Sequence, residues 1–213
     1  MRSLSLVKIV LVLFTITLSS CSDKDERKIW WGFNGNVKTS TERVYNSMLK
    51  FNDVWSYTVE FDKKGLFIGA KTSVPFLNLE TKSVPIRENG KIVAENLYEN
   101  GELKSITTLN IISAKEFESE TKDKNGKKTA YTKSVMEDGK RIMTTEEQDY
   151  TTVQELKNGN LISVKRIKEG EVDFYERYEY VEFDEHNNWI KKLTYKDNET
   201  EPDSVTIRKI EYY

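Results

Sequence analysis

A series of turn signals divides this chain into strand-length segments, and this series constrains the fold more than any other feature of the sequence. Asn-Gly and Asp-Gly pairs supply the positive φ angles that two-residue hairpin turns require. Their alternation with short segments predicts an antiparallel β-meander. The signals are Asp62-Lys63-Lys64-Gly65, Glu88-Asn89-Gly90, Glu99-Asn100-Gly101, Asp123-Lys124-Asn125-Gly126, Glu137-Asp138-Gly139, Lys157-Asn158-Gly159-Asn160, Lys168-Glu169-Gly170, Asp184-Glu185-His186-Asn187-Asn188 and Lys196-Asp197-Asn198.

The residues between the turns alternate in two different ways. Trp55, Tyr57, Val59 and Phe61 are separated by polar residues, so their segment is predicted to form a half-buried strand. Residues 173–183 instead place aromatic and charged side chains on both faces. Because a sheet buried on both sides would carry a nearly continuous Val, Ile and Leu run, these mixed faces favour a largely solvated sheet.

Composition indicates a thin fold that is rich in aromatic residues. The chain is 32% charged and has a mean hydropathy of -0.64, which argues against a thick core. Its 11 Tyr, 9 Phe and 4 Trp residues argue against disorder, because disordered sequences are poor in aromatic residues. Residues 41–53 fit a helix, and residues 39–45 fit a strand equally well, so this choice stays open. We expect an all-β fold with little helix, in which an antiparallel β-meander forms an extended, largely solvated, twisted sheet.

The amino-terminal residues have the pattern of a secretion signal. A positively charged start precedes an apolar run over residues 9–18, and small residues then lead to Cys21, the only cysteine of the chain. The run is shorter than the roughly 20 residues that a membrane-spanning helix needs. Residues 1–20 are therefore predicted to be a signal peptide. One reading leaves Cys21 as an incidental free thiol, which is a reactive group in an oxidising compartment.

The segment Leu18-Ser19-Ser20-Cys21 resembles the lipobox of bacterial lipoproteins. The resemblance implies that Cys21 receives a diacylglycerol on its sulfur, that the chain is cut just before it, and that the new amino terminus is acylated. The membrane is then a partner through this anchor. Ser22 rather than Asp follows the cysteine, which by analogy with the enterobacterial sorting rule favours the outer membrane. The acidic residues that come next resemble a surface-export signal of the Bacteroidetes type, so the periplasmic and surface faces both stay open.

The chain after the cysteine divides into two parts. Residues 21–34 are predicted to be a charged tether and an aromatic segment, and residues 35–213 a repeat-like β-meander domain. Residues 61–68 and 183–190 share an aromatic residue, an Asp, two variable residues, Gly or Asn, and then apolar residues. This pattern resembles the YD repeat of Rhs-type proteins, whose tandem hairpins build extended sheets. The alternative is that any β-meander collects turns of this kind.

The inventory of catalytic and metal-binding residues is short. His186 is the only histidine, so with Cys21 acylated neither a Cys-His pair nor a His-rich zinc site can form. His186 falls in a predicted turn and is interpreted as a turn residue. Asp123 begins a segment that echoes part of a calcium loop but lacks the final ligands, and it is interpreted as a hairpin turn. We expect no cofactor, no metal and no catalytic site.

The densest aromatic cluster is the candidate contact site. Trp30, Trp31 and Phe33 fit either a stacking platform for a sugar or peptide, or a plug that covers a sheet edge. The 33 basic and 35 acidic residues nearly cancel, so no nucleic-acid partner is expected.

These observations favour a membrane-anchored cell-envelope lipoprotein that acts as a non-enzymatic binding or scaffold module for an unknown protein or glycan. One alternative is a toxin-immunity or accessory protein that binds through a sheet edge. Another is a carboxylate-dependent hydrolase of envelope glycans, because carboxylates are plentiful although nothing singles out a pair. A deep cleft with two carboxylates would favour the hydrolase, and an open sheet would favour binding.

Overall fold

The computed structural model describes residue 26 and residues 31–46, 53–113, 115–146, 150–157 and 160–213. The elements whose bounds lie within these residues are fourteen strands and the 3-10 turn η2 (Pro75–Leu77). The strands are β1 (Val37–Asn46), β2 (Asp53–Phe61), β3 (Phe67–Val74), β4 (Leu79–Glu88), β5 (Lys91–Glu99), β6 (Glu102–Ser113), β7 (Glu116–Asp123), β8 (Lys128–Glu137), β9 (Lys140–Thr145), β10 (Tyr150–Lys157), β11 (Asn160–Lys168), β12 (Glu171–Phe183), β13 (Trp189–Lys196) and β14 (Ser204–Tyr212).

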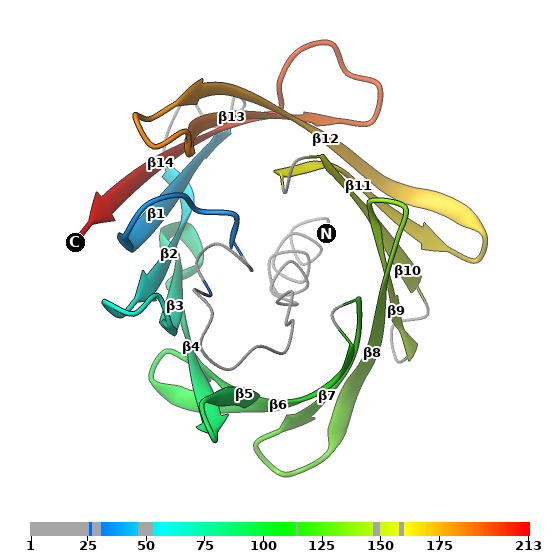
Figure 1. Cartoon of the computed structure of the whole chain (residues 1–213). Coiled ribbons are helices and arrows are strands. Elements are labelled where there is room, and N and C mark those ends of the chain that lie inside the picture. Colours follow the sequence, from blue (N-terminus) through cyan, green and yellow to red (C-terminus); the bar gives the residue numbers. More distant parts are fainter. Residues whose placement is uncertain (1–25, 27–30, 47–52, 114, 147–149, 158–159) are drawn as a thin grey trace.

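The strands close into a single barrel (Figure 1). Each strand pairs antiparallel with the next one in sequence, and β14 returns to pair with β1, where Val37 lies opposite Tyr212. The expectation of an all-β antiparallel meander with little helix is thus confirmed. The expectation of an extended, open, twisted sheet is wrong, because the pairing of the first and last strands removes both edges. Residues 41–46, which also fitted a helix, belong to β1.

Closure also corrects the interpretation of the mixed faces. Because the barrel wall is the single layer of described structure, the face of each strand that is buried is the face toward the lumen. Many luminal positions carry small polar side chains, and Ser40, Ser134 and Thr206 are each 2% exposed. Aromatic and charged residues occur on both sides of β12, because one side lines the lumen and the other lies on the outside of the barrel. Two solvated faces are not needed to explain the pattern.

The turns have the geometry that their residues predict. Asn89 and Gly90 both have positive φ angles, 51° and 79°, as do Asp138 and Gly139, 47° and 74°. A second kind of turn begins at Asp62, Asp123 and Asp184, where one carboxylate oxygen accepts hydrogen bonds from two backbone amides of the same turn. The calcium-loop echo at Asp123 is therefore a hairpin turn, as interpreted from the sequence.

One end of the barrel holds the hydrophobic core. Its buried members are Phe33, Val37, Val59, Phe61, Phe67, Ala70 and Ile92. Trp31 packs against this cluster, with its ring 5.1 Å from that of Phe61 and 4.9 Å from that of Phe67. Since burying one such side chain contributes about 1.5 to 3 kcal/mol, this cluster is a main source of stability for a barrel with a polar lumen.

Candidate functional site

A charged cluster lies on the luminal face where β1, β13 and β14 meet. Glu42 in β1 is the direct register partner of Arg208 in β14, and the Arg208 guanidinium donates to its carboxylate at 2.6 Å. Burial alone would raise the pKa of Glu42, but the charges of Arg208 and Lys192 outweigh burial and hold this pKa below its usual value. The same burial lowers the pKa of Lys192. This pair is a buried, well-formed ion pair with a second cation beside it.

Aromatic rings surround these cations. The Arg208 guanidinium lies 3.3 Å from the ring centroid of Trp189, and the Lys192 ammonium lies 5.1 Å from that of Trp189 and 4.9 Å from that of Tyr178. The Tyr178 hydroxyl donates to Glu176 at 2.8 Å. Cations over aromatic faces gain up to about 2 kcal/mol where water is excluded. The wall of β12, β13 and β14 thus combines flat rings with both signs of charge, which suits a polar ligand with apolar faces.

Two luminal charges lack a partner among the described residues. The side chains of Glu95 in β5 and Arg141 in β9 make neither a hydrogen bond nor an ion pair with the described part of the chain. Burial raises the pKa of Glu95 to about 7 and lowers the pKa of Arg141 to about 10. An unpaired buried charge is costly, so such residues are unusual unless a ligand or water meets them. Neither residue was singled out by the sequence, because most charged residues of a β-meander face solvent.

The outer wall carries exposed ion pairs. Glu116 and Lys133 lie 2.9 Å apart, and Glu182 and Lys191 lie 2.8 Å apart, with all four side chains at least 30% exposed. Further charged side chains, such as Arg43 in the middle of β1, are also exposed. A barrel that crosses a bilayer presents an apolar band about 25 Å tall to the lipid. The described outer wall carries its charged side chains among exposed apolar ones such as Ile68, Ile86 and Val181.

The predicted site residues lie in different places. Cys21 and Trp30 fall outside the described residues. Phe33 is buried and Trp31 packs beside it inside one end of the barrel, where the closed wall leaves no sheet edge to cover. His186 lies in the turn before β13 and stacks on Tyr212 with 4.2 Å between ring centroids. The structure therefore brings Trp31 and Phe33 together and keeps both in the core.

Sequence reasoning missed a clamp at Glu26, a residue of the predicted tether. Its carboxylate accepts two hydrogen bonds from Arg87, at 2.7 and 2.8 Å, and one from the backbone amide of Phe67 at 2.7 Å. Its own amide donates to the carbonyl of Gly65. Glu26 is 7% exposed. A single Glu among charged neighbours gives no sequence signal for such a contact.

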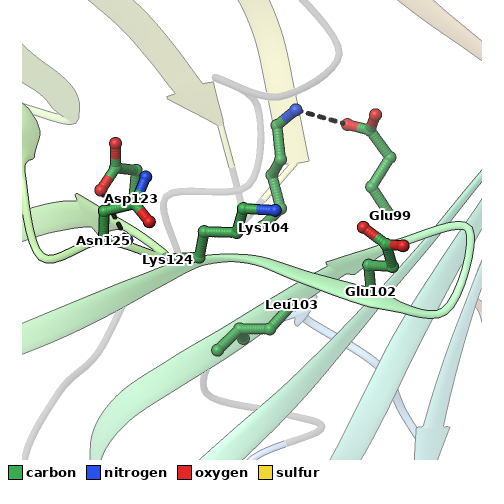
Figure 2. Close-up of a pocket in the computed structure, with 7 residues that line it drawn as sticks. All are labelled: Glu99, Glu102, Leu103, Lys104, Asp123, Lys124 and Asn125. Carbon is green, nitrogen blue, oxygen red and sulfur yellow. Dashed lines mark hydrogen bonds and ion pairs between the residues drawn. The ribbon is translucent and has the colours of Figure 1, made fainter.

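A shallow hollow lies at the opposite end of the barrel, between the β5–β6 and β7–β8 hairpins (Figure 2). Its volume is about 250 Å³. Figure 2 shows the ammonium of Lys104 directed toward Glu99, and the two groups lie 3.7 Å apart. Asp123 holds the amides of its own turn. Glu99 and Asp123 are thus engaged in local structure, and the third acid of the hollow, Glu102, is exposed. The described residues contain no group of three or more His, Cys, Asp or Glu side chains placed to hold a metal ion.

The fold defines the class of this protein as a closed antiparallel β-barrel of fourteen strands. Among solved structures, it is similar to a porin-like protein from Bacteroides uniformis, with a TM-score of 0.52 and 9% sequence identity over 84% of this chain and 99% of that one. At this identity the likeness shows the fold alone. No family model matches the chain, and no curated protein matches it in sequence. No helix among the described residues is long and apolar enough to cross a membrane.

Proposed function

We propose that this chain is a cell-envelope lipoprotein, held at the outer membrane by a lipid on Cys21, and that its barrel is a non-enzymatic binding module whose ligand surface is the luminal wall. The distribution of charge carries the proposal. Exposed ion pairs such as Glu116–Lys133 lie on the outside, while the side chains of Glu95 and Arg141 lie inside with no ion-pair partner among the described residues.

The polar outer wall supports a barrel that stands in water beside the membrane. Closed antiparallel barrels are the architecture of bacterial outer-membrane proteins, and the porin-like neighbour fits such a location. A Lys or Arg on the lipid face costs about 2 to 4 kcal/mol at the bilayer midplane. Three exposed basic residues lie in the middle of their strands, namely Arg43, Lys71 and Lys165. Each would add such a cost if the barrel were inserted in the bilayer. A lipid anchor needs no apolar band on the barrel.

The two alternative functions find less support. Binding through a sheet edge needs an unpaired strand, and every described strand is paired on both sides. A hydrolase needs a free carboxylate pair in a cleft. Of the three acids that line the hollow, Glu99 pairs with Lys104 and Asp123 accepts from backbone amides of its own turn, so only Glu102 is not engaged in this way.

Fractionation of the native envelope tests the anchor. Wild-type protein is expected to take up labelled palmitate and to stay with the membrane after a high-salt wash, whereas Cys21→Ala is expected to lose the label and become soluble. If Cys21→Ala stays in the membrane and is released only by detergent, the barrel itself is inserted and the proposal fails.

Photo-crosslinking tests the luminal wall. A photoreactive amino acid replaces Tyr178, which faces the lumen, or Tyr175, which lies on the outer face of the same strand against Lys165. Crosslinking in intact cells followed by mass spectrometry is expected to give a ligand adduct at position 178 and none at 175. Adducts at 175 alone would move the ligand surface to the outside.

A further inference from the structure

The two ends of the barrel differ in their distance from the anchor. In a meander, successive turns alternate between the ends, so the β2–β3, β4–β5, β8–β9 and β12–β13 turns share one end with the start of β1 and the finish of β14. We call this the anchor end. The β5–β6, β7–β8, β11–β12 and β13–β14 turns form the far end, which includes the hollow of Figure 2.

Glu26 is fixed to the anchor end. Its amide donates to Gly65 in the β2–β3 turn, and Arg87 joins its carboxylate to the carbonyls of Phe67 and Gly90, the latter in the β4–β5 turn. A bidentate Arg–carboxylate pair fixes direction as well as distance, because both hydrogen bonds lie in one plane. The clamp therefore fixes Glu26 against two adjacent turns.

The length of chain between Cys21 and this clamp is short. Glu26 lies five positions after Cys21, and a fully extended chain covers at most about 3.6 Å per position, or about 18 Å. A ten-residue strand such as β4 is about 33 Å long, or about 25 Å along the axis of a barrel with strands tilted by about 40°. The far end is thus beyond the reach of an anchor at Cys21 that passes through Glu26.

Two exposed lysines beside the clamp favour the same orientation of the barrel. Lys63 and Lys64 are exposed in the β2–β3 turn, beside Gly65 of the clamp. Lysine ammonium groups are attracted to lipid phosphates within about a Debye length, roughly 8 to 10 Å. Exposed Glu102 lies at the far end, in a hollow that Lys104 and Lys124 also line, so that end carries both signs of charge.

We infer that the anchor end of the barrel docks on an anionic phospholipid surface, with Lys63 and Lys64 against the headgroups and the Glu26–Arg87 clamp setting the orientation, so that the far end points away from the membrane. This inference rests on the proposed lipid anchor. The β2–β3 turn is then an interface with lipid, and a ligand enters the lumen from the far end.

Two matched turn positions test the orientation. Asn89 at the anchor end and Glu169 at the far end both precede a glycine, have φ angles of 51° and 53°, and are exposed. Acylated full-length protein carrying Asn89→Cys or Glu169→Cys is labelled with a fluorophore on the new thiol. It is then bound to phosphatidylcholine vesicles containing phosphatidylglycerol and a headgroup-linked quencher. We expect several-fold stronger quenching at position 89 than at 169, and equal or reversed quenching would overturn the orientation.

A variant of the Glu26–Arg87 clamp tests whether this ion pair sets the orientation of the barrel. Arg87→Gln removes the bidentate pair, so the difference in quenching between positions 89 and 169 should shrink, while Arg177→Gln on the outer wall should leave it unchanged. An unchanged difference in Arg87→Gln, with the barrel folded by circular dichroism, would remove the clamp from the proposal. Mass spectrometry of the acyl chains separates these outcomes from failure of the proposed function, because a chain without lipid on Cys21 would be detected before the vesicle experiment.

Discussion

Replacing Glu95 with glutamine is expected to stabilise the barrel at alkaline pH and to change little in acid. Glu95 lies in β5, opposite Pro85 in β4 and Thr107 in β6. Burial raises the pKa of its carboxyl from 4.5 to about 7, and no described residue forms a hydrogen bond or ion pair with it. Among the described residues, therefore, nothing offsets the cost of ionising this group in the folded state.

The size of the effect follows from the two pKa values. They differ by about 2.5, and a difference of one corresponds to about 1.4 kcal/mol, so ionised Glu95 destabilises the fold by about 3 kcal/mol. Because the folded pKa is raised, the folded state binds more protons than the unfolded state between pH 4.5 and 7. The stability of the wild type should therefore fall as the pH rises through this window. Glu95→Gln cannot ionise and should exceed the wild type by about 3 kcal/mol at pH 8 and by almost nothing at pH 4.

Urea denaturation followed by tryptophan fluorescence measures this difference. Wild type, Glu95→Gln and the control Glu169→Gln, an exposed turn residue, are compared at pH 4, 6 and 8. The control should match the wild type at each pH. A gain for Glu95→Gln that is constant from pH 4 to pH 8 would refute the reasoning, because it would arise from packing and not from ionisation.

Thermal unfolding by circular dichroism checks two further expectations. Glu42→Gln leaves Arg208 buried without its counter-charge and should lower the free energy of unfolding by about 3 to 5 kcal/mol. Glu182→Gln breaks an exposed pair and should lower it by less than about 1 kcal/mol. Equal losses of stability would contradict the burial argument. Gly35→Ala should lower the stability more than Gly170→Ala. Both glycines have positive φ angles, but a Cβ at position 35 would lie 2.8 Å from a histidine ring. Similar losses of stability would mean that the ring moves aside freely.

Local features of the fold were predictable because they depend on neighbouring residues. Asn-Gly and Asp-Gly pairs favour left-handed turns through their own backbone preferences, and the structure has such turns at Asn89-Gly90 and Asp138-Gly139. The alternation around Trp55 likewise marks a strand with one buried face. These signals predicted the all-β meander and its low helix content.

Closure was not predictable because it depends on one long-range pairing. Val37 and Tyr212 lie opposite each other across the β1–β14 ladder, and neither carries a local signal for that partner. The burial of the luminal face was not predictable either. Small polar residues are typical of solvated positions, and the buried luminal residues include Ser40, Ser134 and Thr206. A polar interior thus resembles a polar surface until the strands are paired.

The candidate site was equally hidden. Charged residues usually face water. A sequence therefore does not distinguish Glu95 from the exposed Glu88 at the end of the preceding strand. It likewise does not distinguish Glu26 from the other acids of the tether. Glu95 differs from the other acids because it lies on the inward face of its strand. Glu26 differs because Arg87, which is distant in the sequence, forms an ion pair with it. Both depend on the barrel.

The luminal charges weigh in favour of binding over a purely structural role. A barrel selected only for stability gains by replacing a buried, unpaired charge with an apolar side chain, and such replacements stabilise proteins by about 1 to 4 kcal/mol even where the charge is paired. Glu95 and Arg141 are charges of this kind among the described residues, and stabilising changes at functional sites characteristically reduce function. A ligand that presents a cation to Glu95 would lower its pKa from about 7 and recover the lost free energy. Such a ligand should therefore bind more tightly at pH 8 than at pH 5, and Glu95→Gln should abolish that pH dependence while leaving the fold intact.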